Sequence, residues 1–225
     1  MKLSPQTVVP SALLTAVLAL LTATFPGTAT AATAAVWTGG AEGTLSTAGY
    51  GGGATYGVDF KSITAQGISA LGFWDSRSDG LGNSSYTVGL WETSSPLTLL
   101  ASVTISNADA LDTSLTVEGG QWRYETIPTV NLTSGKTYTI GFYAPDNMSA
   151  ADSLVLTYPT VTTASTVSKM NNYRVLSGSG FAFPTNVIDL PVAQVNAILV
   201  PEPGSAGLVI LGSLMLLGRR RKTKD

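Results

Sequence analysis

The sequence predicts an all-β protein, built as an antiparallel, jelly-roll-like β-sandwich, and three observations support this fold class. Short runs of residues alternate apolar and polar side chains with a period of two, which is typical of half-buried strands. Clusters of Gly, Ser, Asn and Asp, the residues that favour turns, separate these runs. Between residues 36 and 200, no segment of helical length carries an apolar stripe, and β-branched residues dominate.

The predicted strands are short and follow one another along the chain. Three runs alternate most clearly, each with one apolar face: 86–91, 98–105 and 138–143. Further candidates, rich in β-branched and aromatic residues, are 55–60, 68–74, 121–127, 154–158, 173–176 and 195–200. Short antiparallel strands bury a core only by stacking two sheets or by closing a barrel. We therefore expect one sandwich domain over residues 32–200.

Composition and charge exclude several classes of protein. Only 12% of the 225 residues are charged and the formal net charge is −2, unlike a disordered acidic tail or a basic nucleic-acid binder. Cysteine and histidine are absent, which excludes disulfide bonds, Cys or His zinc sites and His-dependent catalysis. Residues 32–200 carry twelve acidic and six basic side chains, and this net charge of −6 disfavours nucleic acid and anionic lipid as partners.

The first 31 residues have the layout of a secretory signal peptide. A basic residue, Lys2, precedes the apolar run 11–21, which is too short to span the roughly 30 Å hydrocarbon core of a bilayer. Ala29 and Ala31 then form the small-x-small pattern that signal peptidase cleaves, and residues 32–34 repeat that pattern. We expect export of the segment that follows.

The segment 201–225 contains three blocks in a fixed order. A Pro-Glu-Pro triplet comes first, the uncharged run 204–218 follows, and a basic cluster closes the segment. As a helix the uncharged run is about 22 Å long, so we expect a short transmembrane helix that spans the bilayer only marginally. The basic cluster favours the cytoplasm. The triplet consists of Pro201, Glu202 and Pro203, and the arginines that set the topology are Arg219, Arg220 and Arg221.

The residues VPEPGSAGLVILGSLMLLGRRRK in this segment resemble the sorting tail of the PEP-CTERM proteins. This resemblance implies a Gram-negative bacterium that makes exopolysaccharide, and an exosortase, a membrane protease-transpeptidase, as the partner that reads the triplet. Two prolines keep the triplet extended, as a protease substrate requires, and Glu202 would be its recognition charge. An ordinary tail anchor is the alternative.

A second resemblance covers part of the predicted sandwich, from about residue 56 to residue 143. The motifs that carry it are ALGFWD at 70–75, DGL at 79–81, VGLW at 88–91, WRY at 122–124 and YTIG at 138–141. They resemble an uncharacterised β-sandwich ectodomain that is often found in front of such sorting tails. This resemblance implies a fold and brings no activity with it.

The loop DSRSDGLGN has the outline of a calcium-binding loop, with Asp75, Asp79 and Asn83 as candidate ligands beside a backbone carbonyl. Arg77, however, stands where a ligand oxygen belongs, and Tyr86 takes the place of the terminal bidentate Glu. The alternative is a hairpin loop without metal, in which Asp and Asn side chains form turns and Arg77 neutralises a carboxylate.

Two tryptophans are candidates for stacking on sugar rings. Trp91 lies on the face of its strand opposite the apolar positions, and Trp74 ends a strand beside the Asp-rich loop. Indole faces next to polar side chains suit the apolar C–H face of a sugar, whereas burial under loops is the alternative. Trp122 and Tyr124 share a face opposite Arg123 and are predicted to be core.

Three functions remain compatible with these patterns. The first is an exported, non-enzymatic protein of the cell surface or extracellular matrix, structural or adhesive in an exopolysaccharide biofilm. The second is a carbohydrate-binding module that uses Trp74, Trp91 and a loop calcium. The third is a glycoside hydrolase that works with carboxylates alone, although no two Glu residues have a spacing that assigns catalytic roles.

Overall fold

A computed structural model of the chain describes residues 34–39, 52–94, 98–117, 120–145, 162–178, 180–188 and 194–201. Strands dominate these residues, and the one helical element among them is a short 3-10 turn, η1 (Ser76–Ser78). Within this described part, no helix is both long and apolar enough to cross a membrane. The predicted signal peptide and the predicted transmembrane helix 204–218 lie outside the described residues.

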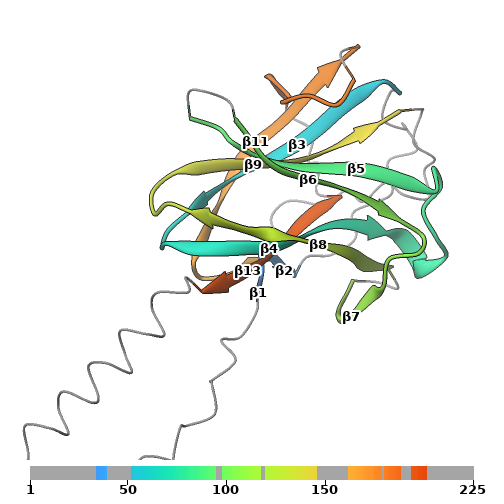
Figure 1. Cartoon of the computed structure of the whole chain (residues 1–225), viewed down its shortest axis with the longest axis horizontal. Helices are drawn as coiled ribbons and strands as arrows, with labels where there is room; N and C mark the ends of the chain where they lie inside the picture. Colours follow the sequence, from blue (N-terminus) through green and yellow to red (C-terminus); the bar gives the residue numbers. More distant parts are fainter. Residues whose placement is uncertain are drawn as a thin grey trace, which may run out of the picture. The chain divides into compact units, whose positions relative to one another are not determined.

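Two antiparallel sheets and one small strand pair make up the fold (Figure 1). The first, called the β4 sheet here, has the order β1-β13-β4-β8-β7, and the second, the β9 sheet, has the order β12-β11-β3-β9-β5-β6. The β4 sheet contains β1 (Ala34–Ala35), β13 (Val195–Pro201), β4 (Gln66–Asp75), β8 (Gly120–Leu132) and β7 (Leu111–Val117). The β9 sheet contains β12 (Asn186–Ile188), β11 (Val167–Ser177), β3 (Ala54–Ser62), β9 (Thr137–Ala144), β5 (Ser85–Glu92) and β6 (Thr98–Ser106). The separate pair is β2 (Trp37–Gly39) with β10 (Thr162–Thr163).

Aromatic side chains from both sheets meet in the core. Phe73 of β4 stacks on Tyr86 of β5, with ring centroids 4.1 Å apart, and meets Phe142 of β9 edge-on at 5.1 Å. All three rings are fully buried. This packing of one sheet on the other confirms the predicted β-sandwich, whereas the jelly-roll connection stays a prediction.

Most predicted strands coincide with strands of the structure. The segments 55–60, 68–74, 86–91, 98–105, 121–127, 138–143, 173–176 and 195–200 lie in β3, β4, β5, β6, β8, β9, β11 and β13, and 154–158 lies outside the described residues. The strand predicted to end at residue 127 continues through Pro128 to Leu132. A register shift opposite Ile68 and Ala70 places this proline at a bulge, where its missing N–H breaks no regular pairing.

The chain enters and leaves the sandwich on neighbouring strands. Ala34 of β1 pairs with Leu199 of β13, and β13 ends at Pro201, which is exposed. Pro201 is also the first residue of the Pro-Glu-Pro triplet. The last described strand therefore ends on the first residue of the predicted sorting segment.

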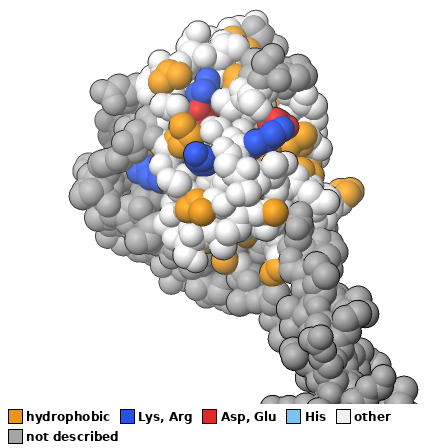
Figure 2. All heavy atoms as spheres, turned by 90° about the vertical axis from the view of Figure 1, so that its left-hand side faces the viewer, with side chains coloured by type: hydrophobic (Ala, Val, Ile, Leu, Met, Phe, Trp, Pro, Cys, Tyr) orange, Lys and Arg blue, Asp and Glu red, His pale blue; other side chains and the backbone are white. Residues whose placement is uncertain are grey.

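The described surface carries few charged or large apolar side chains. Figure 2 shows one face of the molecule, where basic and apolar groups are scattered among uncharged ones and the acidic groups lie next to basic ones. The exposed large apolar side chains of the described residues are Ile63, Leu99 and Val187. Leu99 and Val187 belong to opposite edge strands of the β9 sheet, so these two residues do not share one apolar patch.

Candidate functional site

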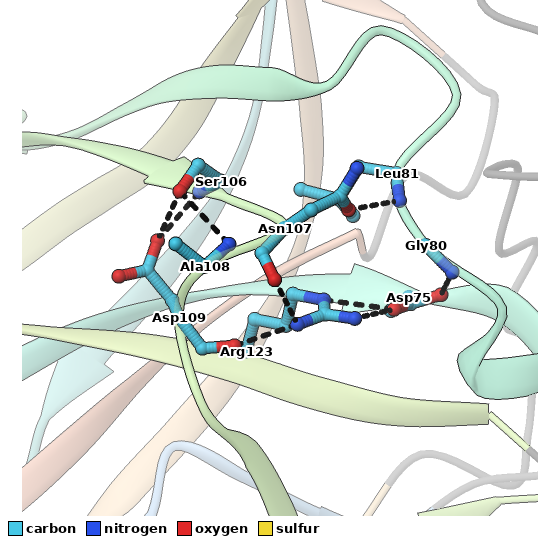
Figure 3. A network of polar contacts seen from close by, with 8 residues as sticks. All are labelled: Asp75, Gly80, Leu81, Ser106, Asn107, Ala108, Asp109 and Arg123. Atoms are coloured by element: carbon cyan, nitrogen blue, oxygen red, sulfur yellow. Dashed lines mark hydrogen bonds and ion pairs between the residues drawn. The ribbon is translucent and has the colours of Figure 1, made fainter.

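The end of β4 is held by a buried ion pair between Asp75 and Arg123 (Figure 3). The Nε and Nη2 atoms of Arg123 lie 2.8 Å and 2.7 Å from Oδ2 of Asp75. Arg123 belongs to the neighbouring strand β8, where it pairs with Phe73 and therefore points to the inner side of the sheet. The Asp75 side chain is fully buried, and that of Arg123 is nearly so.

The same guanidinium group also organises two loops (Figure 3). Its Nη1 atom donates to the carbonyl oxygens of Asn107, at 3.1 Å, and Asp109, at 2.6 Å, in the turn between β6 and β7. The Asn107 side chain accepts a 2.6 Å hydrogen bond from the backbone of Leu81, and Gly80 donates to Asp75 Oδ1 at 3.1 Å. Arg123 thus ties the loop after β4 to the turn after β6.

This network supports the metal-free interpretation of the Asp-rich loop. Both carboxylate oxygens of Asp75 are engaged by protein donors, while Asp79 is exposed and Asn83 is half-buried. The cation that neutralises Asp75 is Arg123 and not Arg77. Arg77 is exposed and has a left-handed backbone, with φ of 65°. Calcium binding stays a prediction, but Asp75 cannot serve it while it is paired with Arg123.

Trp91 is buried under a segment that sequence reasoning did not identify as a cover. Its ring lies 5.2 Å from the ring of Phe181 and 6.2 Å from that of Phe183, and only 3% of the residue is exposed. These phenylalanines belong to residues 180–184, called the strap here. Thr55 of β3 holds the strap, because its hydroxyl donates to the carbonyl of Gly180 and accepts from the amide of Ala182.

A row of glycines across three neighbouring strands explains how Trp91 lies flat against the sheet. Gly57 of β3 pairs with Gly141 of β9, which pairs with Gly89 of β5. A Cβ atom at Gly89 would lie 2.6 Å from both the Trp91 indole and the Phe181 ring. The missing side chains create a shallow slot for these rings, so the prediction of an exposed sugar platform at Trp91 is wrong.

Trp74 is fully buried as well, so it too is not an exposed platform. Its indole packs edge-on against Trp122 of β8 at a centroid distance of 5.1 Å. Because Phe73 faces the core, the next residue, Trp74, lies on the outer face of the β4 sheet. Trp122 is buried, as predicted, but it and Tyr124 lie on this outer face, and Arg123 is the residue between them that points inward.

Sequence reasoning missed Gln194, the residue that precedes β13 and lies beside Trp74. Its backbone carbonyl accepts a 2.9 Å hydrogen bond from the backbone N–H of Trp74, and its side chain is fully buried. Period-two alternation places Gln194 on the face opposite Val195, a core residue. A signal was therefore present, but a single Gln in front of a strand carries no distinctive pattern.

Three other carboxylates among the described residues contact side chains of neighbouring strands or turns. Asp59 pairs with Arg174 at 2.7 Å and accepts a 2.6 Å hydrogen bond from the Thr139 hydroxyl. The contact of Glu92 with Lys136 lowers the pKa of its carboxyl, whereas a hydrogen bond to Asp109 raises the pKa of Glu125. Two of the four Glu residues of the predicted sandwich, Glu42 and Glu118, lie outside the described residues.

The remaining predicted site residues belong mainly to segments outside the described residues. Pro201 is described, as the exposed last residue of β13. The others lie outside: Glu202, Pro203, Arg219, Arg220, Arg221, Ala29 and Ala31. Their predicted roles in cleavage, sorting and topology stay predictions.

Comparison with known proteins gives one match. Residues 41–190, well over half of the chain, match a family described as "Domain of unknown function (DUF4082)". This match spans β3 to β12 and therefore contains strands of both sheets. Comparisons with curated proteins and with solved structures give no match.

Proposed function

Because the chain belongs to this family, whose description assigns no activity, we propose a role from its own residues: an exported, non-enzymatic protein of the cell surface or extracellular matrix. In this proposal the sandwich, with jelly-roll-like connections, is a structural or adhesive unit in an exopolysaccharide biofilm. Sandwiches of this kind present surfaces for binding, but the fold by itself does not assign one.

The observation that carries the proposal is the order of blocks around residue 201. The Pro-Glu-Pro triplet begins with the last residue of β13, and the uncharged run 204–218 and the basic cluster come next. Pro201 is exposed, which is what a protease that acts at the triplet requires. Pro201 pairs with Gln66 at the end of β13, so cleavage after the triplet would leave the described strands intact.

The proposal names its partners and the order in which they act. Signal peptidase removes residues 1–31, and the short helix 204–218 holds the chain in the inner membrane with the sandwich outside. An exosortase then cleaves near the triplet, and the body is released or attached at the surface. The resemblance to PEP-CTERM tails supports this route.

Mass spectrometry of the mature protein tests the sorting step. We expect the peptide that contains Arg219 to be absent from the surface protein in cells with the exosortase and present in cells without it. Glu202→Gln keeps the size of the recognition residue but removes its charge, so we expect less processing. Glu92→Gln changes the same residue type within the sandwich and serves as the control. An intact basic cluster in both strains would reject the sorting proposal.

Saccharide binding is the second candidate, but the burial of the tryptophans disfavours open stacking on a sugar. Trp74 and Trp122 lie on the outer face of the β4 sheet, the Trp37 indole donates to the carbonyl of Val195 in β13, and all three side chains are buried. The third candidate, a carboxylate-based hydrolase, has less support, because Glu92 and Glu125 are each engaged by a neighbouring side chain. Loss of turnover in a Glu→Gln variant would promote it.

A further inference from the structure

We propose that the end of the sandwich that carries Pro201 docks on the membrane that holds residues 204–218. Lysines of this end contact anionic lipid headgroups, and the exposed side chain of Ile63 enters the headgroup layer. The inference rests on the proposed function, because it needs the run 204–218 in the bilayer. It adds to that function a membrane-facing surface on the sandwich itself.

The strand register places the last residue of β13 beside two turns. Pro201 pairs with Gln66, the first residue of β4, and Gln66 pairs on its other side with Leu132, the last residue of β8. The turn that enters β4 and the turn that leaves β8 therefore lie at the end of the sandwich where β13 ends, called the exit end here. Figure 1 shows the turn between β3 and β4 on the left, and this side faces the viewer in Figure 2.

Hydrogen bonds join these turns into one connected surface. The backbone N–H of Ser62 donates to the carbonyl of Lys136 at 3.0 Å, and that of Ile63 donates to the carbonyl of Thr166 at 2.8 Å. The Ser134 hydroxyl donates to the carbonyl of Ile63 at 2.6 Å. The turn after β3, the turn after β8 and the segment before β11 are therefore held together at the exit end.

The length of chain after β13 keeps the exit end close to the bilayer. Glu202 and Pro203 are the only residues between Pro201 and the uncharged run 204–218. The three residue steps from Pro201 to Gly204 span at most about 11 Å. As a helix the run is shorter than the roughly 30 Å hydrocarbon core, so it cannot begin far outside that core, and the headgroup layer beyond it is about 5–8 Å thick. The exit end therefore lies at or just above the headgroups.

Three lysines of the described residues lie at the exit end. Lys61 is exposed on β3, Lys169 is half-buried on the adjacent strand β11, and Lys136 is exposed in the turn before β9. Lys136 pairs with Glu92, so this pair adds no net charge. Lys61 and Lys169 together outweigh the single negative charge of Glu202 in the linker. Anionic headgroups attract such a surface.

Acidic side chains gather at the opposite end of the sandwich. Asp75 ends the strand that Gln66 begins, so about 30 Å separate the two along β4. Asp79 and Asp109 lie in loops beyond Asp75. The net charge of −6 over residues 32–200 disfavours anionic lipid for the sandwich as a whole, but the charge is unevenly distributed. This distribution favours an orientation with the exit end toward an anionic surface.

Ile63 supplies an apolar contact at the exit end. It lies in the turn between β3 and β4, three residues before Gln66, and 49% of it is exposed. The next two residues, Thr64 and Ala65, are exposed and uncharged as well. One exposed isoleucine is ordinary on a protein surface, but this one stands next to the strand pair from which the chain enters the membrane. Its side chain loses contact with water when it enters the headgroup layer.

The tether makes a weak attraction sufficient. Each lysine near an anionic surface shifts the binding equilibrium about fivefold, which is too little to hold a free protein. The short linker 202–203, however, keeps the exit end at a high effective concentration beside the headgroups. The docked orientation therefore needs only a few such contacts to become the major one.

A lipid-quenching measurement on the anchored chain tests this proposal. The chain has no cysteine, so one introduced cysteine carries one fluorophore. Chain isolated from a strain without exosortase is reconstituted in vesicles of phosphatidylglycerol or of phosphatidylcholine, each with spin-labelled lipid. Thr64→Cys places the fluorophore at the exit end, and Asp79→Cys, also at an exposed residue, is the matched control at the opposite end. We expect spin-labelled lipid to quench the fluorophore at residue 64 strongly in phosphatidylglycerol and weakly in phosphatidylcholine, and to leave the one at residue 79 unquenched in both.

Two further substitutions connect the quenching to the proposed contacts. In the Thr64→Cys chain, Lys61→Gln should lower the ratio of docked to undocked chain about fivefold in phosphatidylglycerol. Ile63→Ser should lower this ratio in both lipids, because it removes the apolar contact. Arg77→Gln removes an exposed basic group at the opposite end and should change neither ratio. Thermal melts of each variant show that the sandwich stays folded.

Three outcomes would overturn the proposal. The first is quenching at residue 64 that is no stronger in phosphatidylglycerol than in phosphatidylcholine, and the second is quenching that Lys61→Gln and Ile63→Ser both leave unchanged. The third is a fluorophore shielded from aqueous iodide but not reached by the lipid quencher, which would mean that a second copy of the chain covers the exit end.

The same samples separate failure of docking from failure of the proposed function. Flotation with the vesicles shows whether residues 204–218 anchor the chain. A chain that does not float would overturn the anchor and the docking together. A chain that floats without quenching at residue 64 would overturn docking alone, and the sorting proposal would still be decided by the mass of the C-terminus.

Discussion

Arg123 makes polar contacts with Asp75, Asn107 and Asp109, and so joins one end of β4 to the turn after β6. Replacing it with Met would leave the carboxylate of Asp75 buried without its cation. Breaking a buried pair in this way costs about 3–5 kcal/mol. We expect urea denaturation of Arg123→Met to show a loss of this size.

The double variant Asp75→Leu with Arg123→Met serves as the control for this prediction. Replacing both charges by apolar groups of similar size removes the unpaired carboxylate, so most of the lost stability should return. A single variant as stable as the unaltered protein would show that the pair is not needed to hold the loop. Lys136→Met, which breaks a more exposed pair with Glu92, should have little effect.

Glu125 makes a second residue-scale prediction, on pH. A hydrogen bond to Asp109 raises the pKa of its carboxyl above the ordinary value of 4.5, and the charge of Asp109 adds to this effect. Because the folded-state pKa is the higher one, this contact stabilises the fold below the unfolded-state pKa. That contribution is lost as the pH rises through the folded-state pKa. Glu125→Gln keeps a donor toward Asp109 without a titrating charge, so its thermal midpoint should not show this decline.

Glu92 provides the control of opposite sign. Its hydrogen bond with Lys136 lowers the pKa of the carboxyl, so its contribution is present above the unfolded-state pKa and is lost as the pH falls through the folded-state pKa. Thermal melts from about pH 3 to about pH 8 cover both transitions. Parallel pH profiles for Glu125→Gln and Glu92→Gln would contradict the two assignments.

At the scale of elements, the glycine row and the strap depend on each other. A Cβ atom at Gly141 would lie 2.5 Å from the backbone oxygen of Tyr56 and 3.3 Å from the Trp91 indole. Backbone in a paired strand cannot move aside as a side-chain tip can. We expect Gly141→Ala to cost about 1–3 kcal/mol in urea denaturation. Ser102→Ala, an exposed change on the edge strand β6, is the control and should cost little.

The same region shows how far the sequence predicts structure. Period-two alternation located β5 and its apolar positions, because that pattern depends only on neighbouring residues. It could not show that the strap, about ninety residues later, covers the other face and buries Trp91. Alternation also placed Trp122 and Arg123 on opposite faces correctly. Which face is inner follows from the pairing of Arg123 with the core residue Phe73, a contact between distant positions.

At the scale of the whole molecule, the aromatic core makes the two sheets one cooperative unit. Phe73 of the β4 sheet contacts Tyr86 and Phe142 of the β9 sheet, and all three rings are buried. Buried residues of both sheets belong to one hydrophobic cluster. The sandwich should therefore unfold in a single transition rather than sheet by sheet.

Phe73→Ala tests this coupling. The cavity it leaves should cost about 3–5 kcal/mol, and the loss should appear in both sheets because the ring contacts both. Hydrogen exchange should show faster exchange of the amides of β9 as well as those of β4, by a similar factor. Phe183→Ala, in the strap on the outer side, should speed exchange mainly near Trp91, because it removes a contact with one sheet only. If β9 keeps its protection in Phe73→Ala, each sheet holds its own stability and the two sheets are not one cooperative unit.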